Sequence, residues 1–435
     1  MIQTVRGVHD ILPETIALWQ RLEALALSVF TRYGFEEIRT PLFERTELFA
    51  RAVGATSDIV EKEMYTFADR GGDSLSLRPE GTASVVRAFI EQSRHRQLPW
   101  KVWYRGPMFR YERPQKGRQR QFHQIGCELF GPAGPLADAE LLAMVMRYLG
   151  ELGLQAALVL EINSLGCPEC RPPYRDLLIS CLRKLTDQLC SDCQNRMERN
   201  PLRVLDCKEE RCRTLMESAP VLLDHLCGEC LRHFSLLQGH LSDLSLPFRI
   251  NPRMVRGLDY YNRTAFEVTA VGLGAQNAVA AGGRYDGLVA QMGGTATPAI
   301  GFAVGMERLT LLLDAAKNTP RPGDVYLATL GDRAEKEGLM LAETLRGAGL
   351  TVEMNLGGGS LKSQMKRADR SRSRFALMLG DAEIEKKVAL VKEMSLGRQQ
   401  EVSWNDLPRF LGDSSSVSSV QDHYEPQHAH QGKPL

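Results

Sequence analysis

The segment YRGPMFRYERPQKGRQRQFHQIGCELFG, residues 104–131, predicts two antiparallel strands joined by a cationic loop. Five of its side chains share one parity along the strands: Arg110 and Glu112 before the loop, and Phe122, Gln124 and Glu128 after it. Because alternate residues of a strand point to the same face, these side chains can line one face of a sheet. The segment therefore predicts a polar sheet face beside a cationic loop.

The loop itself carries four cations, Arg113, Lys116, Arg118 and Arg120. Cations over a polar sheet face suit a nucleotide, whose phosphates are anionic. In the alternative interpretation the hairpin lies in solvent and its charges only pair with one another. The segment also contains apolar residues, Phe109, Phe122, Ile125 and Phe130. These residues favour a packed sheet over a hairpin in solvent, and they therefore favour the interpretation as a nucleotide-binding face.

The rest of the chain is predicted to fold around this segment in five parts. The five parts are an α+β core with an antiparallel sheet at 1–166 and 246–314, a cysteine-rich helical insertion at 167–245, a linker at 315–322, an α/β domain at 323–411 and a disordered tail at 412–435. The insertion is inferred because strand-like patterning stops near Cys167 and resumes at Phe248. Prolines and polar residues mark the linker, alternating strands and helices mark the α/β domain, and low apolar content marks the tail.

Composition limits the classes of protein to which the chain can belong. The 435 residues carry 54 Lys and Arg against 53 Asp and Glu, a formal charge of +1, so an anionic partner must be held by a local group of cations. No apolar run approaches the roughly 18–20 residues of a membrane helix, and the N-terminus lacks the pattern of a signal peptide. We expect a cytoplasmic protein without a membrane anchor.

Eight of the ten cysteines fall in four short pairs inside the predicted insertion. The pairs are Cys167 with Cys170, Cys190 with Cys193, Cys207 with Cys212, and Cys227 with Cys230. In a reducing compartment such spacing favours one or two tetrahedral Cys₄ zinc sites over disulfides. The alternative is unligated thiols, with Cys193 and Cys212 simply lying on helices. Any such zinc would be structural, because a closed Cys₄ site leaves no position for a substrate.

Three further segments carry polar side chains of interest. SLRPEGTASVVR at 76–87 places Glu80 and Thr82 at the start of a predicted helix, where they can also act as simple helix caps. RGLDYYNRTAFEV at 256–268 and AAGGRYDGL at 280–288 contain Arg256, Tyr261 and Tyr285. No phosphate-binding loop, serine triad or HExxH helix is found, which disfavours P-loop NTPases and the common hydrolases.

Together these segments resemble the class II aminoacyl-tRNA synthetases. FRYE at 109–112 with its basic loop is similar to motif 2 of that class, GFAVGMER at 301–308 to motif 3, and Pro41 to the proline of motif 1. The segments 256–268 and 280–288 resemble the two signatures of the histidyl-tRNA synthetase family. The similarity runs from Gly7 to about Leu411.

The resemblance implies a class II catalytic core, a C-terminal anticodon-binding domain and a homodimer. It implies activation of histidine with ATP and Mg²⁺ to histidyl-adenylate and pyrophosphate, followed by transfer of histidine to the 3′-terminal adenosine of histidine tRNA. The rival interpretation is a synthetase-like regulatory subunit of ATP phosphoribosyltransferase, or a tRNA-binding or zinc-dependent scaffold with an inactive site. The C-terminal domain and intact motifs favour the enzyme.

The resemblance also assigns roles residue by residue. It implies ATP binding by Arg110, Arg118, Phe122 and Arg308, with Arg110 on the α-phosphate and Phe122 on adenine. Arg256, together with Arg110, would stabilise the reacting anions. Histidine would be bound by Glu80, Thr82, Gln124, Glu128, Tyr261 and Tyr285, and the end of the tRNA would lie near Arg113 and Gln115. In the C-terminal domain, Lys362, Lys366 and Arg370 share one helical face that suits RNA.

Overall fold

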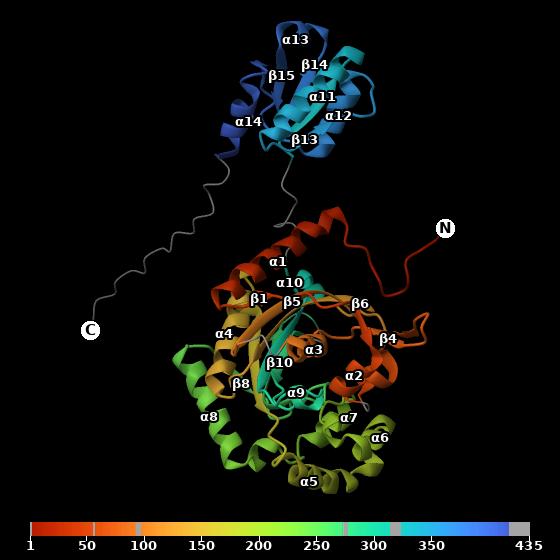
Figure 1. The fold of residues 1–435 in the computed structure, drawn as a ribbon, viewed down its shortest axis with the longest axis vertical. Coiled ribbons are helices and arrows are strands. Elements are labelled where there is room, and N and C mark those ends of the chain that lie inside the picture. The colour runs from red at the N-terminus through yellow and green to blue at the C-terminus, as the bar shows by residue number, and fades with distance from the viewer. Residues whose placement is uncertain are drawn as a thin grey trace, which may run out of the picture. The chain divides into compact units, whose positions relative to one another are not determined.

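A computed structural model describes residues 2–54, 57–92, 97–271, 273, 277–313 and 323–416 of the chain. The chain divides into two compact units, Met1–Thr319 and Pro320–Leu435 (Figure 1). The predicted linker at 315–322 lies outside the described residues.

The first unit is built on an eight-stranded sheet. In spatial order its strands are β1 (Glu36–Glu37), β5 (Trp100–Phe109), β6 (Gln121–Phe130), β11 (Ala299–Gly305), β10 (Ala278–Arg284), β9 (Asn262–Ala270), β7 (Leu158–Ser164) and β8 (Arg249–Ile250). The six central strands are antiparallel, as the sequence predicts, and the two short edge strands β1 and β8 pair in parallel.

Each face of this sheet is covered by its own apolar core. On one face, odd-numbered residues of β6 such as Ile125 and Cys127 pack with the buried sides of α1 (Pro13–Arg32), α4 (Pro135–Glu151) and α10 (Met306–Leu312). On the other face, alternate residues of β5 such as Tyr104 pack with α2 (Thr46–Val53), α3 (Thr82–Gln92) and α9 (Leu288–Gln291). The predicted parity therefore separates an apolar face from the face that holds the polar side chains.

The remaining small elements of this unit border the second face. They are a three-stranded sheet of β2 (Phe43–Arg45), β4 (Ser74–Leu77) and β3 (Thr66–Ala68), and a π-helix, η1 (Ile59–Glu63). A 3₁₀ turn, η3 (Gln155–Ala157), leads into β7.

The cysteine-rich segment is helical, as predicted. It contains α5 (Arg171–Arg183), α6 (Ser191–Arg199), α7 (Glu210–Met216) and α8 (Gly228–Asp243), with 3₁₀ turns η4 (Thr186–Gln188), η5 (Pro201–Val204) and η6 (Leu222–His225). Figure 1 shows α5, α6 and α7 grouped together. By contrast, α8 packs on α4 and buries Phe234, Leu237 and Leu241 in the first core of the sheet. The apolar stripe at i, i+3 and i+7 explains this docking, although α8 lies inside the predicted insertion.

The second unit has the predicted α/β pattern. Its sheet has the order β13 (Val352–Met354), β12 (Val325–Thr329), β14 (Phe375–Leu379), β15 (Val388–Glu393) and β16 (Gln399–Ser403), parallel for the first three strands and antiparallel for the others. Its helices are α11 (Asp332–Gly347), α12 (Leu361–Ser371), α13 (Asp381–Lys386) and α14 (Leu407–Ser416).

The predicted start of the disordered tail, residue 412, needs correction. α14 begins with the buried Leu407 and Leu411 and continues to Ser416. A helix that is already nucleated by packing gains one hydrogen bond for each further residue, so it extends past the last apolar side chain. The remainder of the predicted tail, 417–435, lies outside the described residues.

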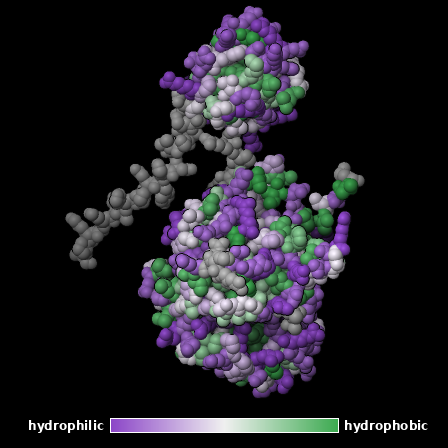
Figure 2. Space-filling view, viewed as in Figure 1, coloured by the Kyte–Doolittle hydropathy of each residue, from purple (hydrophilic) through white to green (hydrophobic). Residues whose placement is uncertain are grey.

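Within the described part of the chain, no helix is long and apolar enough to cross a membrane. Hydrophilic and hydrophobic side chains are intermixed over the visible face of both units (Figure 2).

Candidate active site

A cavity of about 210 Å³ opens on the polar face of the eight-stranded sheet. Nine of the residues predicted to bind histidine or ATP line it: Glu80, Thr82, Arg110, Arg118, Phe122, Gln124, Arg256, Tyr261 and Arg308. They come from the start of α3, the β5–β6 hairpin, the segment before β9 and the start of α10. The structure thus brings together side chains that lie more than 200 positions apart in the sequence.

Arg110 follows the last residue of β5 and is fixed on two sides. Its Nε donates to the carbonyl of Pro79 at 2.8 Å, and its guanidinium lies 5.3 Å from the ring centroid of Phe122. Because Phe122 projects from β6 into the same cavity, the ring and the cation form one continuous wall. A planar base and an adjacent phosphate fit such a wall.

Two more arginines line the same cavity. Arg118 pairs with Glu112 at 2.5 Å, and Arg308, on the first turn of α10, donates to the carbonyl of Ala278. Burial lowers the pKa of Arg308, and the positive charges of Arg118 and Arg110 lower it further, against the opposing effect of Glu112 and Glu267. Because the positive charges of these arginines repel one another, a bound polyanion would stabilise their charged forms.

Arg256 lies in the segment between β8 and β9, and its guanidinium is mostly buried. It pairs with Glu267 on β9 and lies 5.5 Å from the ring centroid of Tyr261. Burial by itself would lower the pKa of Arg256, but the charge of Glu267 and the neighbouring Tyr261 and Tyr260 together outweigh it, so the pKa is raised. Among the described residues its buried Nε has no hydrogen-bond partner. A buried donor without a partner is available to a ligand.

Glu80 has the helix-capping role that the sequence left open. Its carboxylate accepts the backbone N–H groups of Thr82 at 2.6 Å and Ala83 at 2.8 Å, at the start of α3. Burial raises its pKa, against the lowering effect of these hydrogen bonds. Because Glu80 also lines the cavity, it presents part of its negative charge to a ligand while it caps the helix.

Glu128 and Tyr285 lie beneath the cavity and do not line it. The carboxylate of Glu128 is fully buried on β6 and accepts the hydroxyl groups of Thr82 at 2.7 Å, Tyr104 at 3.4 Å and Tyr285. Burial raises the pKa of Glu128 to about 8, against these hydrogen bonds, so the group is mainly protonated at neutral pH. A Cβ at Gly301, on the neighbouring strand β11, would overlap this carboxylate, which explains why motif GFAVG has glycine there.

The paired glycines of β10 also have a packing role. A Cβ at Gly282 would overlap the carbonyl of Gly301 on β11, and the register of β10 against β9 shifts between Gly283 and Arg284. Arg284 is fully buried and donates to Asp138 and Asp286, both at 2.8 Å. This part of segment 280–288 therefore holds the sheet together, while Tyr285 reaches Glu128.

The cavity is also lined by residues that no motif in the sequence singles out. Tyr104, Gln119, Tyr260 and Glu307 also line it. Glu307 accepts the backbone N–H of His123 at 2.9 Å and approaches its Nδ1 at 3.0 Å, which ties α10 to β6. Tyr104 lies on β5 with the same parity as Arg110, so alternation along the strand is the sequence pattern that points to it.

The two residues predicted near the tRNA end lie outside the cavity wall. Arg113 and Gln115 are exposed in the loop between β5 and β6, and Gln115 pairs with Arg118 through two backbone hydrogen bonds of 3.0 and 2.9 Å. In the second unit, Lys362, Lys366 and Arg370 are exposed on one face of α12, as predicted. Arg367 is instead bound to the carbonyl of Gly358.

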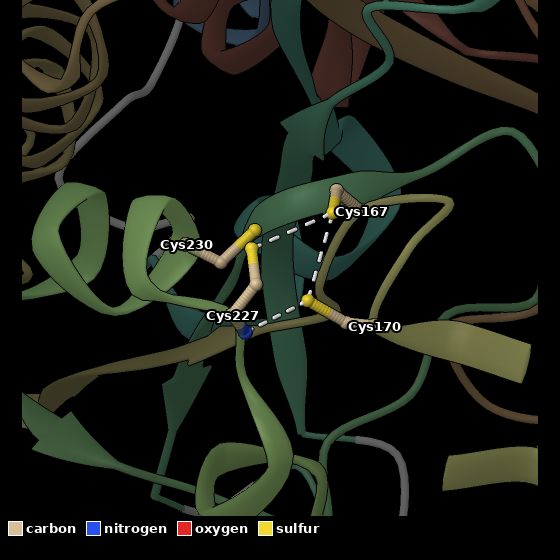
Figure 3. Close-up of side chains that lie close together, drawn as sticks. All are labelled: Cys167, Cys170, Cys227 and Cys230. Carbon is tan, nitrogen blue, oxygen red and sulfur yellow. Dashed lines mark hydrogen bonds between the residues drawn. The ribbon is translucent and has the colours of Figure 1, made fainter. Parts of the chain in front are cut away.

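The eight paired cysteines form two separate clusters within the described residues. The neck cluster is Cys167, Cys170, Cys227 and Cys230, and the inner cluster is Cys190, Cys193, Cys207 and Cys212. In each cluster all four Sγ atoms lie within 4.8 Å of one another. Figure 3 shows the side chains of the neck cluster directed toward one another. Cys193 and Cys212 do lie on helices, and their thiols nevertheless join the inner cluster.

Comparisons with known proteins identify the family that this chain resembles. A family model described as histidyl-tRNA synthetase matches residues 7–168 and 180–309, and an anticodon binding domain model matches 324–413. The histidine–tRNA ligase of Trichlorobacter lovleyi is 53% identical over 402 residues, covering 92% of this chain and 96% of the relative.

Solved structures extend the comparison to the fold. The apo histidyl-tRNA synthetase of Staphylococcus aureus superposes with a TM-score of 0.79 at 37% identity, covering 94% of this chain and all of that one. An ATP phosphoribosyltransferase regulatory subunit/histidyl-tRNA synthetase from Bacillus halodurans superposes with a TM-score of 0.61, covering 84% of this chain and 96% of that one. At 21% identity the second likeness shows the fold alone.

Proposed function

Because the chain belongs to the histidyl-tRNA synthetase family, we propose that the cavity on its eight-stranded sheet is where histidine reacts with ATP. The enzyme is an aminoacyl-tRNA ligase: it activates histidine to histidyl-adenylate, with release of pyrophosphate, and then transfers histidine to the 3′-terminal adenosine of histidine tRNA. The observation that carries the location is the convergence of nine predicted residues on one cavity.

The activation step brings two anions together. The carboxylate of histidine attacks the α-phosphate of ATP in line with the departing pyrophosphate, and the two repel unless cations lie between them. Arg110 and Arg256 both line the cavity and are held from behind, by Pro79 and Glu267 respectively. We assign to them the neutralisation of the reacting oxygens, in fixed positions that need no rearrangement during the reaction.

The other cations are assigned to the leaving group. Arg118 and Arg308 would bind the β- and γ-phosphates, with the adenine ring on Phe122. Mg²⁺, when bound, would neutralise phosphate charge. Glu112 and Glu307 line the cavity, but Glu112 pairs with Arg118 and Glu307 with His123, so phosphate oxygens and water would supply most of the ligands of the ion.

Histidine is assigned to the side of the cavity nearest α3. The buried Oε1 of Gln124 has no hydrogen-bond partner among the described residues and would accept from the ammonium group, together with Glu80 and Thr82. Tyr261 would meet one edge of the imidazole. Glu128, supported by Tyr285, would meet its other edge from beneath the cavity. A pocket that hydrogen-bonds both ring nitrogens rejects analogues without them.

The other assignments follow from the family and from surfaces of this chain. The C-terminal unit would bind the tRNA anticodon, with the cations of α12 on its phosphates, and Arg113 and Gln115 would meet the acceptor end. A zinc ion on insertion cysteines would be structural. A cytoplasmic location is assigned from the family.

The enzyme is expected to form a homodimer. Three large apolar side chains are exposed in the single chain: Leu42 and Phe43, which follow the motif 1 proline Pro41, and Phe67. The rings of Phe43 and Phe67 contact each other, with 6.5 Å between their centroids. Exposed apolar side chains that cluster in this way are typical of an interface. Sedimentation equilibrium should give twice the mass of the chain, and a monomer at micromolar concentration would contradict the assignment.

The direct test of the function is histidine-dependent exchange of pyrophosphate into ATP without tRNA, with the other amino acids as controls. Exchange with histidine alone is the expected result and would demonstrate formation of histidyl-adenylate. Histidine binding without exchange would favour the regulatory paralogue.

Replacing Phe122 with alanine tests the adenine site. Loss of a stacking surface worth about 1–3 kcal/mol should raise the KM for ATP roughly 5- to 150-fold, and the KM for histidine should change little. The control is Tyr111→Ala, because Tyr111 is an exposed aromatic residue of the same hairpin that does not line the cavity. Equal effects of the two variants on the KM for ATP would exclude Phe122 from the adenine site.

A further inference from the structure

The cysteines of the insertion are arranged as two metal sites of the same kind. Neighbouring Sγ atoms are 3.6 Å apart between Cys167 and Cys170, 3.8 Å between Cys167 and Cys227, and 3.8 Å between Cys190 and Cys207. Four thiolates at about 2.3 Å from a central zinc ion lie about 3.8 Å apart along the edges of their tetrahedron. A disulfide would instead require about 2.05 Å.

We propose that the neck cluster and the inner cluster each bind one Zn²⁺, so that the chain holds two structural zinc ions. All four sulfur atoms of each cluster lie within 4.8 Å of one another, which fits a single ion at the centre. An iron–sulfur cubane would hold its thiolates farther apart, since each binds a different corner of the cluster.

Backbone groups around both clusters support thiolate ligands. The N–H of Cys227 points to Sγ of Cys170 at 3.1 Å, and the N–H of Cys190 points to Sγ of Cys212 at 3.3 Å. Cys227 and Cys190 are also the residues immediately before α8 and α6. The N-terminal end of a helix stabilises nearby negative charge, and such hydrogen bonds orient metal ligands.

Bound metal would also stabilise the fold of the insertion. Its own apolar cluster, packed among α5, α6 and α7, includes five of the cluster cysteines among its buried members. Cores of this size rarely stabilise a fold by hydrophobic burial alone, and a structural metal is a common supplement. The cysteines of the neck cluster come from the start of the insertion, before α5, and from the beginning of its last helix, α8. One zinc ion bound there would therefore link the two ends of the helical segment.

The two sites flank the segment that carries Arg256 and Tyr261. Arg171, next to Cys170, donates to the carbonyl groups of Leu165 (3.0 Å) and Tyr261. Asn200, directly after α6, donates to Asp259 of this segment at 3.0 Å. If the proposed function is right, the ion of the neck cluster, through Arg171, and the ion of the inner cluster, through Asn200, both help to position this segment for histidine.

The test begins with metal and thiol counts on the full-length protein, purified after growth with zinc. We expect two zinc ions per chain and, after denaturation with a chelator, ten reactive thiols, the number of cysteines in the sequence. Cobalt(II) in place of zinc should give the intense visible bands of tetrahedral thiolate coordination. Two free thiols with four disulfides, or a metal content near zero, would overturn the proposal. A content of one would overturn the two-site assignment.

Paired variants locate each ion. The double variants Cys167→Ser with Cys227→Ser, and Cys190→Ser with Cys207→Ser, should each retain one zinc ion, and the control Cys181→Ser should retain two because Cys181 belongs to neither cluster. In the inner-cluster variant, calorimetry should show histidine binding weakened roughly tenfold. An unchanged affinity after loss of that ion would overturn the positioning role. The metal count does not depend on activity, so it stands apart from the exchange test. If a double variant does not fold, the counts on the unmodified protein still decide.

Discussion

Replacing Arg256 with alanine is expected to lower the rate of histidine-dependent pyrophosphate exchange at least about 100-fold, the usual effect of losing one preorganised charge donor. Arg256 is held by Glu267, which raises its pKa, and its buried Nε has no partner among the described residues. Its positive charge is therefore fixed at the cavity before the substrates bind. Because the charge acts mainly as the two anions approach each other, the dissociation constant for histidine should change less than about tenfold.

The matched control for this prediction is Arg253→Ala. Arg253 lies three positions earlier and donates to the carbonyl groups of Glu217 and Pro220, but it does not line the cavity. The measurement is the rate of histidine-dependent pyrophosphate exchange at saturating ATP and histidine, with histidine binding followed separately by calorimetry. A near-normal rate in Arg256→Ala would remove this residue from the mechanism, whatever its effect on histidine affinity.

Replacing Glu128 with glutamine is expected to change how stability depends on pH. Burial raises the pKa of Glu128 from an ordinary 4.5 to about 8 in the folded protein. Below pH 4.5 the group is protonated in both states and contributes its full stability. As pH rises toward 8 the unfolded state loses the proton more readily, so the free energy of unfolding falls, by on the order of 4 kcal/mol over this interval.

The Glu128→Gln variant lacks this titration, so its free energy of unfolding relative to that of the original protein should rise steadily between pH 5 and pH 8. The measurement is denaturant unfolding of both proteins across that range. Glu91→Gln is the control, because Glu91 is an exposed residue of α3 paired with Arg87. A difference that is constant with pH would show that Glu128 is ionised in the folded protein.

The same variant tests the imidazole site. An amide in place of the carboxyl group changes which hydrogen bonds can be made to Thr82, Tyr285 and the imidazole. Histidine affinity should therefore fall roughly 10-fold or more. Retained affinity would exclude Glu128 from recognition of the substrate while leaving its effect on stability in place.

Some features of this protein follow from the sequence alone because they depend on local patterns. Alternation along 104–131 is sufficient to predict that Phe122, Gln124 and Glu128 share a face, since a strand has a period of two. The alternation of strands and helices after residue 323 likewise predicts the second unit. The motif residues also meet at one cavity, as the resemblance to the synthetase family implies.

Other features depend on contacts between distant segments, and only the tertiary structure decides them. The spacing of the cysteines left open one zinc site or two, and the fold joins Cys167 and Cys170 to Cys227 and Cys230 while the two middle pairs meet each other. The sequence alone does not decide whether Glu80 caps a helix or faces a ligand. In the structure it caps α3 and also lines the cavity. The protonation of Glu128 is decided by its burial among groups from α3, β5 and the segment after β10, because the pKa of a carboxyl group depends on the water it has lost.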